Sequence, residues 1–285
     1  MAPDAPILPG ATIGLLGGGQ LGRMTGMAAR AMGYDVHVLD PDPDCPARAV
    51  ASRVVTGRFD DAAAAADLAR RCDVVTLEIE QIAPTALEAV QQHAPLRPGA
   101  GAVWIIQDRV RQKDWLAEHA FPVGPFRHAE SAGDVAGAVE AMGASIVKAA
   151  HGGYDGRGQA DLARADEAER AWREVGGRRS VVEQKLDLLL EFSVLVARTA
   201  DGRMAVYPPA LNHHVRGVLA WSVLPAALPP EIARAGAEIA MGIAEGMEVV
   251  GLLAVEQFVT TDGRVLVNEL APRPHNTYHA SERAC

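Results

Sequence analysis

The sequence has only three cysteines and no long hydrophobic run. Cys45, Cys72 and Cys285 form no CxxC motif and cannot all pair, so we expect a reduced environment and no disulfide framework. No apolar segment approaches the roughly 20 residues of a membrane-spanning helix, and residues 1–10 lack the basic segment of a secretory signal. These absences predict a soluble, cytoplasmic protein that has no membrane partner.

The chain also lacks a surplus of basic residues. Its 27 Lys and Arg residues stand against 36 Asp and Glu residues, which gives a formal net charge of −9. Nucleic acid is therefore not the expected partner, because binding it requires positive charge to neutralise phosphates. A small anionic substrate needs only local positive charge. The length of 285 residues, with 49% hydrophobic and 22% charged, suffices for two globular domains or for one domain with a substantial inserted lobe.

A lysine precedes a glycine-dense loop in the segment IVKAAHGGYDGRGQ, residues 146–159. Lys148 lies at the end of an expected strand, and four glycines follow between residues 152 and 158. Such a loop can cover a polyphosphate, because glycine lets backbone N–H groups approach closely. It is not a Walker A loop, since the lysine comes before the glycines. The alternative is a surface hairpin rich in turn residues.

Two glutamates near the end of the sequence favour the phosphate-binding alternative. Residues 249–259 and 264–270 are rich in β-formers and flank a Thr-Asp-Gly turn, which predicts a hairpin. With Asp262-Gly263 as a two-residue loop, Glu256 lies opposite Glu269 on one face of the sheet, whereas a three-residue loop would separate them. Two close carboxylates attract a hard cation, Mg²⁺ or Mn²⁺ in its place, that also binds phosphate. Unless these are merely solvated glutamates, the chain binds ATP with a divalent metal.

Strands and helices alternate in the first hundred residues, which predicts a Rossmann-like α/β domain with a parallel sheet. The remainder predicts an α+β domain. The expected strands are 12–16, 36–40, 73–78, 146–148, 180–184 and 192–199, followed by the hairpin strands. The expected helices are 20–32, 60–71, 84–93, 109–119, 131–142 and 230–246.

The first turn offers a competing interpretation. Gly17, Gly19 and Gly22 form G-x-G-x-x-G after a strand, and Asp40 ends the next strand. This matches the dinucleotide fingerprint, with Asp40 placed for a ribose hydroxyl, so an NAD-dependent dehydrogenase is the rival enzyme class. The same helix N-terminus can serve any anionic ligand, and Gln20 could contact a substrate there. A dehydrogenase would leave the glycine loop and the acidic pair unexplained.

Six blocks in order resemble the ATP-grasp ligases, and most closely the 5-(carboxyamino)imidazole ribonucleotide synthases. They are IGLLGGGQLGRM (13–24), DVVTLEIEQI (73–82), QDRVRQK (107–113), VKAAHGGYDGRGQ (147–159), VEQ (182–184) and NELAPRPHN (268–276). The resemblance implies a carbon–nitrogen ligase of purine biosynthesis that uses ATP and bicarbonate to carboxylate aminoimidazole ribonucleotide through carboxyphosphate. It also implies a homodimer. The expected domains are an N-terminal substrate-binding domain (1–106), an ATP-grasp small subdomain (107–182) and an incomplete large subdomain (183–285).

The resemblance also assigns site residues. Those expected to bind ATP are Arg109, Lys148, Gly153, Tyr154, Asp155, Gly156, Arg157, Gly158, Gln159, Glu183, Gln184, Lys185, Leu186, Glu191, His214, Asn268 and Glu269. Those expected to meet the imidazole nucleotide are Gln20, Glu80, Tyr154, Asp155, Arg157 and His275, and the last four are the expected catalytic residues. Glu256 and Glu269 are the expected metal ligands.

Three departures from the family's pattern bear on these expectations. Thr277 and Tyr278 replace the usual Ser-Gly, and a tyrosine in a glycine position is expected to crowd the site or to resist the required dihedrals. Residues 188–190 are three leucines, more apolar than usual. Family members continue beyond Cys285 with a lobe that supplies basic residues for the substrate phosphate, so we expect an incomplete chain. A formate-using sibling ligase and an inactive nucleotide-binding remnant therefore stay open as alternatives.

Overall fold

A computed structural model describes residues 6–153, 158–215 and 217–281. The N-terminal part is a four-stranded parallel sheet with the order β3-β2-β1-β4. Its strands are β1 (Thr12–Leu16), β2 (Asp35–Asp40), β3 (Arg53–Thr56) and β4 (Val74–Leu77), and its helices are α1 (Gln20–Ala31), η1 (Pro46–Ala49), α2 (Ala62–Ala69) and α3 (Pro84–Gln91). Sequence analysis missed β3, a four-residue edge strand without full burial.

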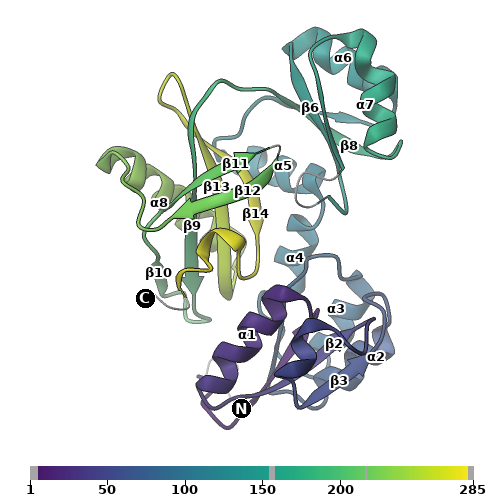
Figure 1. The fold of residues 1–285 in the computed structure, drawn as a ribbon, viewed down its shortest axis with the longest axis vertical. Helices are drawn as coiled ribbons and strands as arrows, with labels where there is room; N and C mark the ends of the chain where they lie inside the picture. Colours follow the sequence, from purple (N-terminus) through teal and green to yellow (C-terminus); the bar gives the residue numbers. More distant parts are fainter. Residues whose placement is uncertain (1–5, 154–157, 216, 282–285) are drawn as a thin grey trace.

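Helices α4 (Ala100–Ile106) and α5 (Arg109–Glu118) connect this sheet to the rest of the chain (Figure 1). Sequence analysis did not predict α4. Its Val103 packs into the core of the N-terminal sheet, whereas Ala102 and Ile106 pack into the core of the largest sheet. The Asp108 side chain accepts hydrogen bonds from Val110 N and Arg111 N, and this N-cap starts α5 at Arg109. The short helix α4 thus contributes to two hydrophobic cores and joins them.

The next part is a small antiparallel sheet with the order β5-β8-β6-β7, on which helices α6 and α7 pack (Figure 1). Its elements are β5 (Phe126–Ala129), α6 (Ala132–Met142), β6 (Ser145–Ala149), β7 (Gln159–Leu162), η2 (Ala165–Glu167), α7 (Ala168–Glu174) and β8 (Ser180–Gln184). Lys148 of β6 pairs with Gln159 of β7, so the glycine loop joins these two strands. Residues 154–157, in the middle of this loop, lie outside the described residues.

The largest sheet is antiparallel, with the order β12-β11-β9-β13-β14 and β10 paired to β9. Its elements are β9 (Leu188–Arg198), β10 (Met204–Val206), β11 (Ala210–Val215), β12 (Val218–Val223), α8 (Pro230–Gly246), β13 (Gly251–Thr260), β14 (Val265–Ala271) and η3 (Asn276–Tyr278). Helix α8 packs closely on this sheet at Gly236, where a Cβ atom would lie 2.5 Å from the Phe192 ring. Within the part of the chain described, no helix is long and apolar enough to cross a membrane.

The turn of the β13–β14 hairpin differs from the prediction, but the predicted pairing of Glu256 with Glu269 is present. Thr260 N donates to Arg264 O at 3.0 Å, which leaves a three-residue loop where two residues were predicted. The register nevertheless shifts between Glu256 and Gln257, because Asn268 is an extra residue in β14. This β-bulge restores the pairing that the longer loop would have lost, and Glu256 lies opposite Glu269 as predicted.

Candidate active site

Lys148 connects the small sheet to the largest sheet. Its Nζ lies 3.2 Å from Glu183 Oε1 in the neighbouring strand β8 and 3.3 Å from Asn268 Oδ1 in β14. Asn268 in turn donates from Nδ2 to Glu256 Oε2 at 3.2 Å. The bulge thus places Asn268 between Lys148 and Glu256, and four predicted site residues from four strands come together.

A second lysine, which sequence analysis did not assign, binds the other oxygen of Glu183. Lys113 Nζ lies 3.3 Å from Glu183 Oε2, and the Lys113 side chain is only 4% exposed. Burial raises the pKa of Glu183, but the two lysines outweigh this effect and bring the pKa down to about 2. Lys113 follows Arg109 by four residues, and residues i and i+4 lie on the same face of a helix. This spacing is the one feature of the sequence that could have indicated Lys113.

Arg109 ties the base of the glycine loop to the acidic pair. Its Nη1 donates to Ala149 O at 3.1 Å and its Nη2 to Gly153 O at 2.8 Å. Nη2 also lies 3.4 Å from Glu269 Oε1. Burial raises the pKa of Glu269, yet Arg109 and then Lys148 outweigh it, so the net shift is downward. Glu269 therefore faces the loop, as the ATP hypothesis requires.

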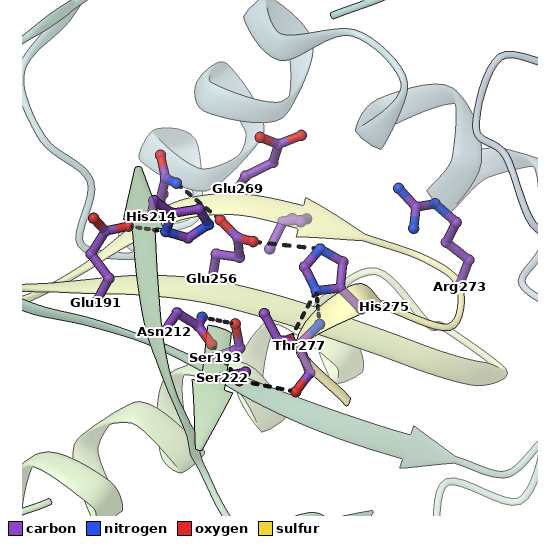
Figure 2. Close-up of polar contacts among 12 residues, drawn as sticks. Glu191, Ser193, Asn212, His214, Ser222, Glu256, Glu269, Arg273, His275 and Thr277 are labelled. Carbon is purple, nitrogen blue, oxygen red and sulfur yellow. Dashed lines mark hydrogen bonds and ion pairs between the residues drawn. The ribbon is translucent and has the colours of Figure 1, made fainter. Parts of the chain in front are cut away.

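Glu256 has fewer positively charged neighbours than Glu269 to offset the effect of burial on its pKa. Burial, followed by repulsion from Glu269, raises the pKa of Glu256 to about 7. Both carboxylates rise from the same face of the two strands (Figure 2). Among the described residues, no group of three or more His, Cys, Asp or Glu side chains could hold a metal alone. The pair suits a hard cation that takes its other ligands from phosphate or water.

His275 contacts Glu256 through one ring nitrogen and Thr277 through the other (Figure 2). Thr277 N donates to Nδ1 at 3.5 Å, and Thr277 Oγ1 lies 2.9 Å from the same atom. Because a backbone N–H can only donate, Nδ1 is the acceptor and the proton of the neutral ring is on Nε2, 3.4 Å from Glu256 Oε1. Burial, then the Arg273 charge, lowers the pKa of His275 to about 3.

His214 and Glu191, on strands β11 and β9, form the opposite side of the Glu256 environment (Figure 2). His214 Nδ1 lies 2.8 Å from Glu191 Oε2. The Glu191 contact is the first cause of a raised His214 pKa, and the Glu256 charge adds to it. The His213–His214 pair thus has one member in the site, whereas exposed His213 stacks on Trp221.

Glu80 of the N-terminal domain pairs with Arg273, a residue that sequence analysis left unassigned. Glu80 Oε1 lies 2.6 Å from Arg273 Nε. Burial raises the pKa of Glu80 more than Arg273 lowers it. Gln20 is exposed at the first residue of α1, and no hydrogen bond joins it to the other described candidates. The structure therefore brings Glu80, but not Gln20, into the connected group.

Residues 183–186, which are expected at the adenine edge, lie at the end of β8 and in the connection to β9. Gln184 Nε2 donates to Met142 O at 2.8 Å, and exposed Lys185 lies 3.4 Å from Asp161. Leu186 packs beside Gly124. Of the glycine-loop residues, Gly153, Gly158 and Gln159 are described, whereas Tyr154, Asp155, Gly156 and Arg157 lie outside the described residues.

The dinucleotide fingerprint is occupied by the protein's own carboxylates. Glu78 accepts hydrogen bonds from Gly19 N and Gly22 N, each at 2.6 Å. Asp40, which the fingerprint would place on a ribose, accepts from Gly18 N at 2.8 Å. The N-terminus of α1 is thus filled by anions from within the fold, which argues against the dehydrogenase alternative.

Comparisons with known proteins identify the family of this chain. A family model described as an ATP-grasp domain matches residues 114–285, and a ribonucleotide synthetase preATP-grasp domain matches residues 10–107. The N5-carboxyaminoimidazole ribonucleotide synthase of Brucella melitensis biotype 1 is 38% identical over 97% of this chain and 77% of its own length. The chain belongs to the N5-carboxyaminoimidazole ribonucleotide synthase family. The Bacillus subtilis synthase is 36% identical over 98% of this chain and 74% of its own length.

Solved structures of N5-carboxyaminoimidazole ribonucleotide synthases have the same fold. An ADP complex from this family superposes with a TM-score of 0.93 at 37% identity, over 100% of this chain and 75% of that one. The Aspergillus clavatus synthase in complex with ADP and 5-aminoimidazole ribonucleotide gives a TM-score of 0.89 at 28% identity, over 96% and 73%. The predicted fold class and the predicted enzyme class, an ATP-grasp ligase, are confirmed.

One expectation drawn from the N5-carboxyaminoimidazole ribonucleotide synthases is wrong. Tyr278 does not crowd the site, because its ring is buried in a hydrophobic cluster and contacts Tyr207. Its hydroxyl lies 2.9 Å from Ser193 O and 3.0 Å from Pro208 O, and it accepts from Leu195 N. Tyr278 is absent from the positive-φ positions, so no dihedral is strained.

Proposed function

We propose that this chain activates bicarbonate with ATP and carboxylates aminoimidazole ribonucleotide. The main support for this proposal is that Lys148, Arg109 and the Glu256–Glu269 pair lie close together at the base of the glycine loop. Cations for phosphate oxygens and acids for a metal then lie at one place, as phosphoryl transfer requires. Family membership supports the choice of substrates.

The acidic pair would hold Mg²⁺, with Mn²⁺ as a substitute, and the metal would neutralise charge on the transferring phosphoryl group. The raised pKa of Glu256 supports this assignment, because part of it comes from repulsion by Glu269, which a metal ion between the two carboxylates would relieve. Lys148 and Arg109 contact protein oxygens here, and both would exchange these partners for ATP phosphates. By resemblance to the family, Glu183 to Leu186 would face adenine, Glu191 would contact the ribose, and His214 would assist at the nucleotide.

In the proposed reaction, a bicarbonate oxygen attacks the γ-phosphorus, ADP leaves, and carboxyphosphate forms. The exocyclic amine of the imidazole nucleotide then attacks the carboxyl carbon, and phosphate leaves. His275 presents Nε2–H toward this space, so it would donate a hydrogen bond to a developing oxyanion. Tyr154, Asp155 and Arg157 would exclude water and orient the amine, a role that rests on resemblance alone.

The division at 1–106, 107–182 and 183–285, a homodimeric assembly and a cytoplasmic location are part of the same proposal. Separate hydrophobic clusters support the domain division: one is confined to residues 16–103 and another to residues 129–182, whereas a third consists mainly of residues after 190.

Phosphate release by the full-length protein tests the function. We expect release that requires ATP, bicarbonate and aminoimidazole ribonucleotide together. Release that persists without either acceptor substrate would contradict the carboxylating reaction, and support by formate in place of bicarbonate would indicate the sibling ligase. ATP binding by calorimetry without turnover under any of these conditions would indicate an inactive remnant.

A further inference from the structure

Lys113 is a buried cation that has no role in the proposed function. The chain has three lysines, and two of them converge on the carboxylate of Glu183. Lys113 Nζ also donates to Val267 O at 3.5 Å, in the strand residue that precedes the bulge. A buried ammonium is costly even when it is paired, so a second lysine on one carboxylate requires an explanation.

The charge balance of Glu183 provides that explanation. With Lys148 as its only partner, Glu183 would form a neutral pair, and a phosphate would have to compete with the full carboxylate charge for Lys148. Lys113 satisfies Glu183 Oε2 and leaves only Oε1 for Lys148. With both lysines protonated the trio carries a net positive charge, so Lys148 can turn toward a phosphate while Glu183 stays paired with Lys113.

Helix α5 also fixes the bulge from both sides. Lys113 binds Val267 O, and Gln112 Oε1 accepts from Leu270 N at 3.2 Å. These two contacts bracket Asn268 and Glu269, which contact Lys148 and Arg109 respectively. One helix turn therefore sets both the position of Glu183 and the position of the strand segment that faces Lys148.

We propose that Lys113 is a positioning residue of the nucleotide site, which holds the Glu183 carboxylate so that Lys148 is available for phosphate. The proposal rests on the proposed function, in which Lys148 binds ATP phosphates. It places Lys113 out of contact with the nucleotide and predicts that its effect depends on the charge of Glu183.

Calorimetric titration of Mg·ADP into four proteins tests this dependence: wild type, Lys113→Met, Glu183→Gln and the double variant. We expect Lys113→Met to raise the Kd about tenfold, because the unshared Glu183 charge then retains Lys148. In the Glu183→Gln background the same change should alter the Kd less than about twofold. Lys113→Arg should stay within about threefold of wild type. Arg203→Met, which removes an exposed cation from a surface turn, is the matched control and should leave the Kd unchanged.

The outcomes separate this proposal from the function on which it rests. No ADP binding by the wild type would overturn the proposed function and the role of Lys113 with it. Wild-type binding together with equal effects of Lys113→Met in both backgrounds, or with no effect, overturns the role of Lys113 alone. If Lys113→Met does not fold, as judged by circular dichroism and melting, Lys113→Gln carries the same comparison, since it keeps a donor for Val267 O without the charge.

Discussion

Glu256 and Glu269 face each other across β13 and β14 only because Asn268 forms a bulge between them and the turn. The loop of three residues would otherwise place the two carboxylates on opposite faces of the sheet, since successive strand side chains alternate. The bulge also directs Asn268 to Glu256 and Lys148. One inserted residue therefore supplies both the acidic pair and the amide between the acids and the lysine.

Replacing either acid should remove the metal dependence of nucleotide binding. Without metal, Glu256→Gln and Glu269→Gln should bind ADP as well as the wild type or better, because repulsion with phosphate is reduced. With Mg²⁺, the wild type should gain at least about tenfold in affinity and each variant much less. Isothermal titration with and without EDTA measures the difference. Exposed Glu231→Gln on α8 is the control, and a full Mg²⁺ gain in both site variants would contradict the metal assignment.

The metal-free protein should lose stability as the pH rises through about 7. Burial and Glu269 raise the Glu256 pKa to about 7, so the folded state holds a proton that the unfolded state releases near its ordinary value of 4.5. The stabilisation is fully present below pH 4.5 and disappears above pH 7. In EDTA, Glu256→Gln should therefore melt at a higher temperature than the wild type at pH 8, with little difference near pH 5. An equal gap at both pH values would contradict the raised pKa.

The Thr277 hydroxyl should help hold the His275 ring in place, whereas the Thr277 N–H sets the position of its proton. Thr277→Val keeps the backbone donor and the side-chain shape but removes the hydroxyl that contacts Nδ1. We expect kcat to fall about tenfold while the Kd of ADP stays unchanged, since one supporting hydrogen bond contributes about 0.5–1.5 kcal/mol. Thr277→Ser should restore kcat. Equal losses in the serine and valine variants would show that packing, not the hydroxyl, matters.

The sequence predicted the elements that carry the site better than the contacts between them. Strand and helix patterns located Lys148, Glu183 and Glu256 on their strands, because those segments have clear periodicity or β-rich composition. The bulge at Asn268 could not be predicted, since neither period nor propensity distinguishes a two-residue from a three-residue loop around Thr-Asp-Gly. The pairing was therefore predicted correctly through an incorrect turn.

Contacts between separate domains were the least predictable. Glu80 was assigned to substrate by resemblance, yet its carboxylate pairs with Arg273, nearly two hundred residues away. The burial of Lys113 follows from how α5 packs against two sheets, which no local pattern contains. Glycines after β1 indicated an anion site correctly, but the anion proved to be Glu78 of the protein itself.

Tyr278 should stabilise the turn that carries His275 without taking part in nucleotide binding. Its single hydroxyl proton is shared between Ser193 O and Pro208 O, while its oxygen accepts from Leu195 N. Tyr278→Phe leaves these buried groups without that partner and should lower the free energy of unfolding by about 1–3 kcal/mol.

The control is Tyr34→Phe, which loses one hydrogen bond to Ile7 O and should lower the free energy of unfolding by less. Denaturant unfolding measures both, and the Kd of ADP should stay within about twofold of wild type. A large loss of ADP affinity at unchanged stability would instead place Tyr278 in the binding site, as the sequence first suggested.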